Sequence, residues 1–88
     1  METLLFVVEE RFQLTSIGLV LTPGLGDNPH NVTIGAPIKL IRPDKSEIIS
    51  VLAGIMLVEA RHISLPQSIK KEDVPVGTEV WLLNSHDD

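Results

Sequence analysis

Several residue classes are scarce in this chain, and each absence excludes a class of function. None of the 88 residues is cysteine, which excludes a disulfide framework, a thiol nucleophile and a zinc site with cysteine ligands. Seven Lys and Arg stand against twelve Asp and Glu, for a formal net charge of -5, so binding to phosphate backbones is not expected. One tryptophan and two phenylalanines are too few to form a base-stacking platform for single-stranded nucleic acid.

Long hydrophobic runs are also missing. The longest near the start is Leu4–Val8, which is flanked by Glu2, Glu9 and Glu10. A signal peptide needs an apolar stretch of about 7–15 residues after a basic start, and a transmembrane helix needs about 20. We therefore expect a cytoplasmic protein with no membrane association.

The residues that are abundant favour strands. Valine and isoleucine number 18 and alanine only 3, and β-branched residues suit a pleated, half-buried surface. Six glycines and six prolines leave little room for an uninterrupted helix. The length supports one domain over residues 1–88, with an ordered core at about 3–84 and a frayed tail at 85–88.

Turn residues divide the chain into segments with strand character: Thr3–Thr15, Leu19–Thr22, Val32–Ile34, Ile38–Arg42, Glu47–Ile63 and Thr78–Leu83. Pro66–Asp73 is the one segment that reads as a helical turn. Periodicity alone leaves a buried helix open for Glu47–Ile63, but its Ile, Val and Gly54 favour a long strand kinked at Gly54.

The first segment carries two different patterns. Its beginning is almost continuously apolar, which is typical of a strand covered on both faces. Its end alternates, which predicts Phe12 and Leu14 pointing inward and Arg11, Gln13 and Thr15 pointing outward. Glu9 and Glu10, between the two halves, indicate a bulge or a bend where the strand changes sheet.

Six or seven strands with turns every 8–12 residues predict an all-β barrel or sandwich. We favour a small closed, mostly antiparallel β-barrel, because closure removes exposed strand edges. Gly18 is expected to take a positive φ in a tight connection after Ser16, and Pro43–Ser46 is expected to form a hairpin loop.

Three segments in order carry a family resemblance. They are F-x-L-x-x-x-G-x-V-x-T-x-G from Phe12 to Gly24, V-T-I-G-x-P-I-x-L from Val32 to Leu40, and S-I-K-K-E-D-V-P-V-G-T-E-V-W from Ser68 to Trp81. Together they resemble the second domain of translational GTPases such as elongation factor Tu. The resemblance implies a closed, mostly antiparallel β-barrel. The chain has no room for a GTPase domain and no Walker-type phosphate loop, and we assign no functional residue from the family.

Pro23–His30 is the longest loop in the sequence and the first candidate for a contact surface. The partner-contact residues we expect there are Gly24, Leu25, Gly26, Asp27 and Asn28. A phosphate cradle is not expected, because no helix follows the loop, Asp27 repels anions, and prolines remove backbone donors.

Trp81 is the remaining candidate contact residue. A core or rim position is the simpler interpretation of a single tryptophan. If its ring instead points outward opposite Val80, it becomes the best interface anchor in the chain.

Reactive constellations are not apparent in the sequence. His30, His62 and His86 are dispersed, and adjacent acids on a strand point to opposite faces. No serine lies in a Gly-x-Ser-x-Gly elbow. We expect no catalytic, cofactor or metal site, and therefore no enzyme activity, although distant groups that converge in the fold would be invisible here.

Two function hypotheses follow. The first is a non-catalytic interaction module, a free-standing translation-factor-like barrel that binds a protein partner or self-associates. Its mean hydropathy of +0.22 is high for so small a domain, and extra apolar surface marks interfaces. The alternative is a module that binds a small ligand or an RNA end through the loop at 23–30.

Overall fold

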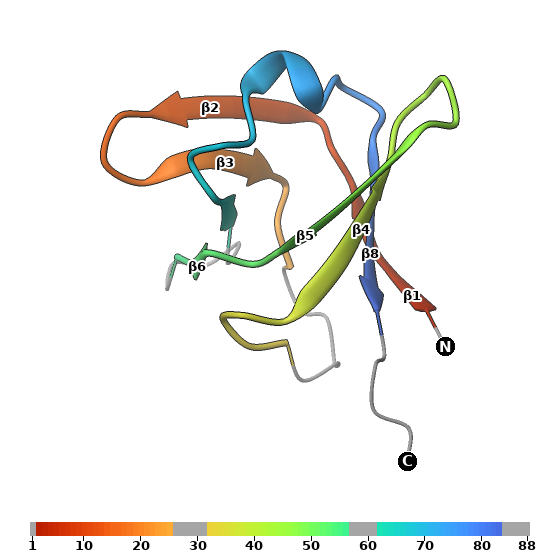
Figure 1. Ribbon diagram of the computed structural model, residues 1–88, viewed down its shortest axis with the longest axis horizontal. Coiled ribbons are helices and arrows are strands. Elements are labelled where there is room, and N and C mark those ends of the chain that lie inside the picture. The colour runs from red at the N-terminus through yellow and green to blue at the C-terminus, as the bar shows by residue number, and fades with distance from the viewer. Residues whose placement is uncertain (1, 26–31, 57–61, 84–88) are drawn as a thin grey trace.

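The computed structural model describes residues 2–25, 32–56 and 62–83, and within them the chain forms two four-stranded antiparallel sheets (Figure 1). One sheet has the order β1-β8-β4-β5 and the other β2-β3-β7-β6. The strands are β1 (Glu2–Val7), β2 (Glu10–Leu14), β3 (Gly18–Thr22), β4 (Pro37–Ile41), β5 (Glu47–Val51), β6 (Gly54–Ile55), β7 (Ile63–Leu65) and β8 (Glu79–Leu83). A single turn of 3₁₀ helix, η1 (Lys71–Asp73), precedes β8. The all-β prediction is confirmed.

Two stretches of chain belong to both sheets. Between β1 and β2, the Val8 N–H donates to Thr78 O at 2.8 Å on one side, and the Glu9 N–H donates to Thr22 O at 2.8 Å on the other. Between β5 and β6, Leu52 N–H donates to Ala36 O at 3.0 Å, and Ala53 N–H donates to Ser64 O at 2.9 Å. Because successive backbone groups point to opposite sides, each bend transfers the chain from one sheet to the next. The predicted bend is present, one residue earlier than expected, at Val8–Glu9 rather than Glu9–Glu10.

Because of these bends, the structure differs from the sequence prediction in the number of strands and in the closure of the barrel. The described residues form eight strands rather than six or seven, because Thr3–Thr15 is divided into β1 and β2, and the described part of Glu47–Ile63 contains β5, β6 and the start of β7. No helix lies in that part, so its strand character is confirmed, but the expected kink at Gly54 is instead a break at Leu52–Ala53 that separates β5 from β6. The described strand pairings form two separate sheets and not a single closed barrel.

The sequence predicted a short strand or bridge at Val32–Ile34. This prediction is wrong, because the segment leads into a turn. The Ala36 N–H donates back to Thr33 O at 3.1 Å, and Gly35 takes a φ of +92°. A chain that reverses this tightly leaves no length for pairing before β4 begins at Pro37.

The predicted orientation of β2 is wrong. Phe12 and Leu14 are exposed, whereas Arg11 is half-buried and its Nη1 donates to Val74 O at 3.1 Å. On the same side, Gln13 Oε1 accepts a hydrogen bond from the Lys71 N–H at 2.9 Å. The polar side chains of β2 therefore point toward η1, because a single helical turn leaves backbone groups that need external partners.

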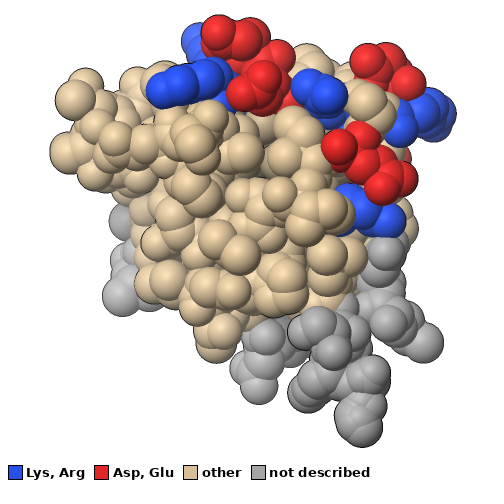
Figure 2. Space-filling view, viewed as in Figure 1, with Lys and Arg blue, Asp and Glu red and all other residues tan. Residues whose placement is uncertain are grey.

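A second arginine reaches η1 from the hairpin between β4 and β5. Arg42 Nη1 donates to Asp73 O at 3.4 Å, and its Nε donates to Ser46 Oγ at 2.7 Å. Charged side chains gather along this end of the molecule, over η1 and the hairpin, and the rest of the described surface in view carries few (Figure 2).

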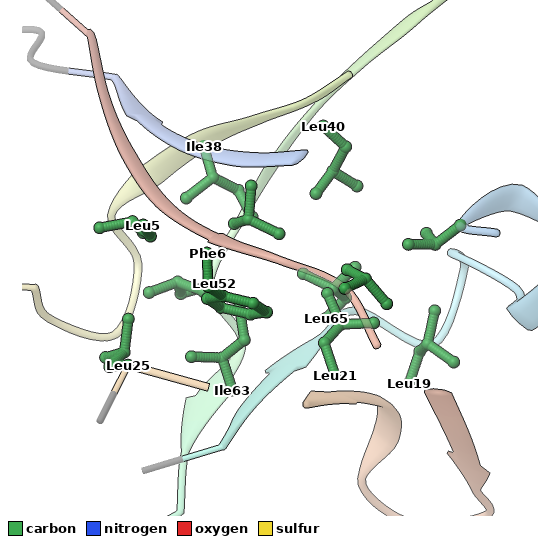
Figure 3. Packing of buried hydrophobic residues seen from close by; sticks show 13 residues of the cluster. Leu5, Phe6, Leu19, Leu21, Leu25, Ile38, Leu40, Leu52, Ile63 and Leu65 are labelled. Atoms are coloured by element: carbon green, nitrogen blue, oxygen red, sulfur yellow. The ribbon is translucent and has the colours of Figure 1, made fainter. Parts of the chain in front are cut away.

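The hydrophobic core lies between the two sheets, which face one another with their aliphatic side chains interleaved (Figure 3). Ile38 and Leu40 on β4 are fully buried, as the alternation predicted, and Val80 on β8 lies beside Leu40. The cluster of buried residues comprises Leu5, Phe6, Val8, Leu19, Leu21, Leu25, Ile38, Leu40, Leu52, Ile63, Leu65, Val74 and Val80. Since both sheets contribute to one core, they form one folding unit.

The predicted hairpin loop at Pro43–Ser46 is confirmed. Its hydrogen bonds depend on the protonation state of Asp44. Asp44 Oδ1 accepts hydrogen bonds from Ser46 Oγ at 2.5 Å and from the Ser46 N–H at 2.9 Å. These bonds favour the charged carboxylate and lower the pKa of Asp44 below its ordinary value.

We expect these hydrogen bonds to persist at and above the ordinary aspartate pKa of about 3.9 and to be lost as the pH falls through the lowered value. The Ser46 amide chemical shift, followed by NMR from neutral pH to pH 2, should report a midpoint below that of a free aspartate. In Asp44→Asn the Ser46 shift should stay flat over this range. A midpoint at or above the free value would contradict the expectation.

Candidate functional site

The outward side of the β1-β8-β4-β5 sheet carries a row of mainly apolar residues, interrupted by one lysine. Strand register places Leu4 opposite Trp81, Trp81 opposite Lys39, and Lys39 opposite Ile49, so these four side chains cross the sheet side by side. They alternate with Leu40 and Val80, which point into the core, so they lie on the outer surface.

Neighbouring rows extend this surface, which we call the outer sheet face. Its residues are Leu4, Val7, Pro37, Lys39, Ile41, Glu47, Ile49, Val51, Glu79, Trp81 and Leu83. Ile49 is 63% exposed, and Leu4, Val7 and Val51 are each 43% exposed. A mainly apolar surface that spans four strands is larger than the isolated exposed hydrophobic residues that every protein has.

Polar groups on the outer sheet face are largely paired with one another. Trp81 Nε1 donates to Glu79 Oε1 at 2.9 Å, and Lys39 Nζ lies 4.0 Å from Glu47 Oε1. The Lys39 side chain is 16% exposed and that of Glu47 is 52% exposed. The lysine therefore lies down against the sheet, and the charge that this pair presents to solvent is mainly negative.

Trp81 takes the outward alternative that the sequence left open. Its ring is half-buried near the centre of the outer sheet face, and its N–H already has a partner in Glu79. Another protein can therefore cover the ring without leaving this donor unpaired.

The loop residues that the sequence predicted as partner contacts do not form an exposed contact surface in the described part of the loop. Gly24 is buried, and Leu25 is 4% exposed and belongs to the core cluster. Gly26, Asp27 and Asn28 lie outside the described residues, as do His30 and His86. The structure thus brings Trp81 together with residues that the sequence analysis did not select.

Sequence reasoning missed the outer sheet face because the apolar start of the chain was interpreted as a strand covered on both sides. Leu4 and Val7 are in fact exposed. The available signal was the adjacent pair Ile48 and Ile49, since neighbours on a strand face opposite ways and only one can enter a two-sheet core.

A shallow pocket of about 300 Å³ lies between η1 and the β4–β5 hairpin. It is lined by Arg42, Pro43, Asp44, Glu72 and Pro75. Arg42 is engaged by Ser46 and Asp73, and Asp44 by Ser46, so these polar groups hold the loops together. Within residues 2–25, 32–56 and 62–83, no three His, Asp or Glu side chains gather closely enough to hold a metal ion.

Comparison of the chain with protein-family models, with curated proteins and with solved structures gives no match. In the part of the chain that the structure describes, no helix is long and apolar enough to span a bilayer. The choice of the outer sheet face as the candidate site rests on its geometry.

Proposed function

We propose that this chain is a non-catalytic interaction module that binds a protein partner through the outer sheet face. The observation that carries the proposal is the mainly apolar surface that crosses all four strands, with Trp81 at its centre. Contiguous exposed apolar surface of this kind is typical of protein–protein interfaces, and tryptophan is enriched among their energetic hot spots.

Charge indicates the chemistry of the partner. The chain carries a net charge of -5, and Glu47 exposes its carboxylate at one end of the outer sheet face while Lys39 is mostly covered. A partner whose apolar surface is bordered by Lys or Arg complements this arrangement, and opposite charges at an interface rim raise the association rate.

The resemblance to the second domain of translational GTPases remains part of the proposal. In support, two bends carry the chain from one sheet to the other, as a barrel built from bent strands requires. On this view the chain is a cytoplasmic relative of that domain, built from two sheets joined by bent strands, and it acts by binding.

The alternative, a small ligand or an RNA end bound by the loop at 23–30, gains no support from the described part of that loop. Leu25 is packed in the core, and the net charge of -5 opposes a nucleic acid. No specific observation favours it over the outer sheet face.

Affinity capture with matched variants tests the proposal. The double variant Leu4→Gln and Val7→Gln makes the outer sheet face polar without adding charge. Phe12→Gln and Ile17→Gln, which change residues of similar exposure outside the outer sheet face, form the control pair. We expect proteins retained from a lysate by the natural chain to be retained by the control pair and lost from the first pair.

The proposal fails if both pairs retain the same proteins, or if the natural chain retains none. Thermal melts of all three proteins establish that each is folded at the temperature of the capture. Partners identified by mass spectrometry should in addition bind more weakly as salt is raised, because the rim contact is electrostatic.

A further inference from the structure

Strand β5 is the last strand of its sheet, and its hydrogen-bond pattern leaves one side open. Two backbone bonds bracket the β4–β5 ladder: Arg42 N–H to Ser46 O at 2.8 Å, and Leu52 N–H to Ala36 O at 3.0 Å. Hydrogen-bonded pairs alternate along an antiparallel ladder, so the even-numbered residues of β5 bond to β4. Glu47, Ile49 and Val51 therefore direct their N–H and C=O groups away from the sheet.

These outward groups are available for pairing. Among the described residues, no hydrogen bond uses the backbone N–H of Glu47, Ile49 or Val51. The side chains of the same three residues are exposed, with Ile49 at 63%. The Val51 carbonyl oxygen accepts one hydrogen bond, from Ser50 Oγ at 3.5 Å, and keeps a second lone pair for a partner strand. A row of outward donors and acceptors is a template for another strand.

The other three edges of the two sheets are less suited to pairing. β1 has a register shift between Leu4 and Phe6, and β6 has two residues. β2 lies beside η1, which it contacts through Arg11 and Gln13. β5 has five residues with no proline and no register shift, and its centre is an isoleucine.

We propose that β5 pairs antiparallel with β5 of a second copy of this chain, with Ile49 of the two copies directly opposite. This inference goes beyond the proposed function, because it uses the backbone edge of β5 and leaves the outer sheet face free for the partner proposed above. Among the registers that match outward groups to outward groups, this is the one that pairs all five residues of the strand. It sets Glu47 opposite Val51 of the second copy, so like charges never face one another.

In this register Glu47, Ile49 and Val51 each exchange two N–H···O=C bonds with the second copy, because all three stand in hydrogen-bonded pairs. The two outer sheet faces then join into one continuous apolar surface. The contact is small beside the roughly 1,200–2,000 Å² of a stable interface, so the dimer forms in a concentration-dependent way.

Sedimentation equilibrium from micromolar to millimolar protein is the first test. The weight-average mass of the natural chain should rise from 9.7 kDa toward twice that value. Ile49→Pro removes the outward N–H and leaves the bonds to β4 in place, so this variant should remain at 9.7 kDa. Ile49→Thr keeps both the N–H and the strand propensity and should still dimerise.

Cysteine cross-linking is the second test, and it stays decisive if the proline variant fails to fold. The natural chain has no cysteine, so a single substitution gives an unambiguous bond. Opposite residues of a hydrogen-bonded pair have Cα atoms about 5.5 Å apart, within the range for a disulfide. Ile49→Cys should form a linked dimer at least about tenfold faster than Ile34→Cys, whose residue is equally exposed in a turn.

Mixing Glu47→Cys with Val51→Cys checks the register, since each should cross-link to the other faster than to itself. The proposal is overturned if the natural chain stays at 9.7 kDa at every concentration, or if Ile49→Cys cross-links no faster than Ile34→Cys. A monomer that still loses captured partners through Leu4→Gln and Val7→Gln would overturn this inference and leave the proposed function standing.

Discussion

Replacing Gly18 with alanine is expected to destabilise the protein by at least about 3 kcal/mol, among the largest effects of a single methyl group. Gly18 opens β3 with a φ of +109°, a conformation that L side chains rarely adopt. A Cβ built there would overlap the carbonyl oxygen of Leu65 on the paired strand β7. Backbone in the middle of a sheet cannot retreat without breaking its own ladder, so strain and clash add.

Gly35→Ala is the matched control, because Gly35 has a similar φ of +92° but nothing lies within 4 Å of its Cβ position. Only the conformational strain remains there, about 1–2 kcal/mol. Urea unfolding of both variants separates the cost of the overlap with Leu65 from the cost of the strained backbone conformation. Equal losses in the free energy of unfolding would show that the contact with Leu65 costs nothing.

Truncating Leu40 to alanine is expected to lower the free energy of unfolding by about 2–5 kcal/mol. Leu40 has no exposed surface, and it lies on β4, which is paired on both sides, by β5 and β8. Its side chain enters the core between the two sheets (Figure 3). A strand held on both sides moves little, so the cavity stays open and the lost contacts are not recovered.

Ile49→Ala provides the contrast on the next strand. Ile49 is 63% exposed, so its truncation should cost within about 0.5 kcal/mol in dilute solution. Denaturant titrations of the two variants, run side by side, compare an inward and an outward residue of one sheet. Losses of similar size would mean that the assignment of the two faces is wrong.

The sequence predicted the strands well where a turn residue carried a specific physical demand. Pro43 and Asp44 located the hairpin, and Gly18 located the entry into β3 with its positive φ. The bend near Glu9–Glu10 was visible as two acids within an apolar segment. Each of these signals is local, so the rest of the fold is not needed to interpret it.

The orientation of β2 was not predictable in the same way. Phe12 and Leu14 look like core residues by hydropathy, but Arg11 and Gln13 have partners around 60 positions away, in η1 and in the residue that follows it. A short helical turn with unpaired backbone groups draws the polar side of the strand toward it. Periodicity identifies two faces of a strand, and only tertiary contacts decide which face is covered.

The candidate site was predicted in part. Trp81 was selected on its residue type, and its outward position follows from its alternation with Val80. The residues around it come from β1, β4 and β5, which are brought together by strand order that the sequence does not state. The loop at Pro23–His30 was selected on length, and the buried position of Leu25 shows that a loop residue can complete a small core.

The bends at Val8–Glu9 and Leu52–Ala53 also determine how the molecule comes apart. Neither sheet can melt alone, since peeling one away pulls on the two stretches of backbone that continue into the other. In a hydrogen-exchange experiment, the slowly exchanging amide protons of the two sheets should therefore share one opening free energy rather than form two groups.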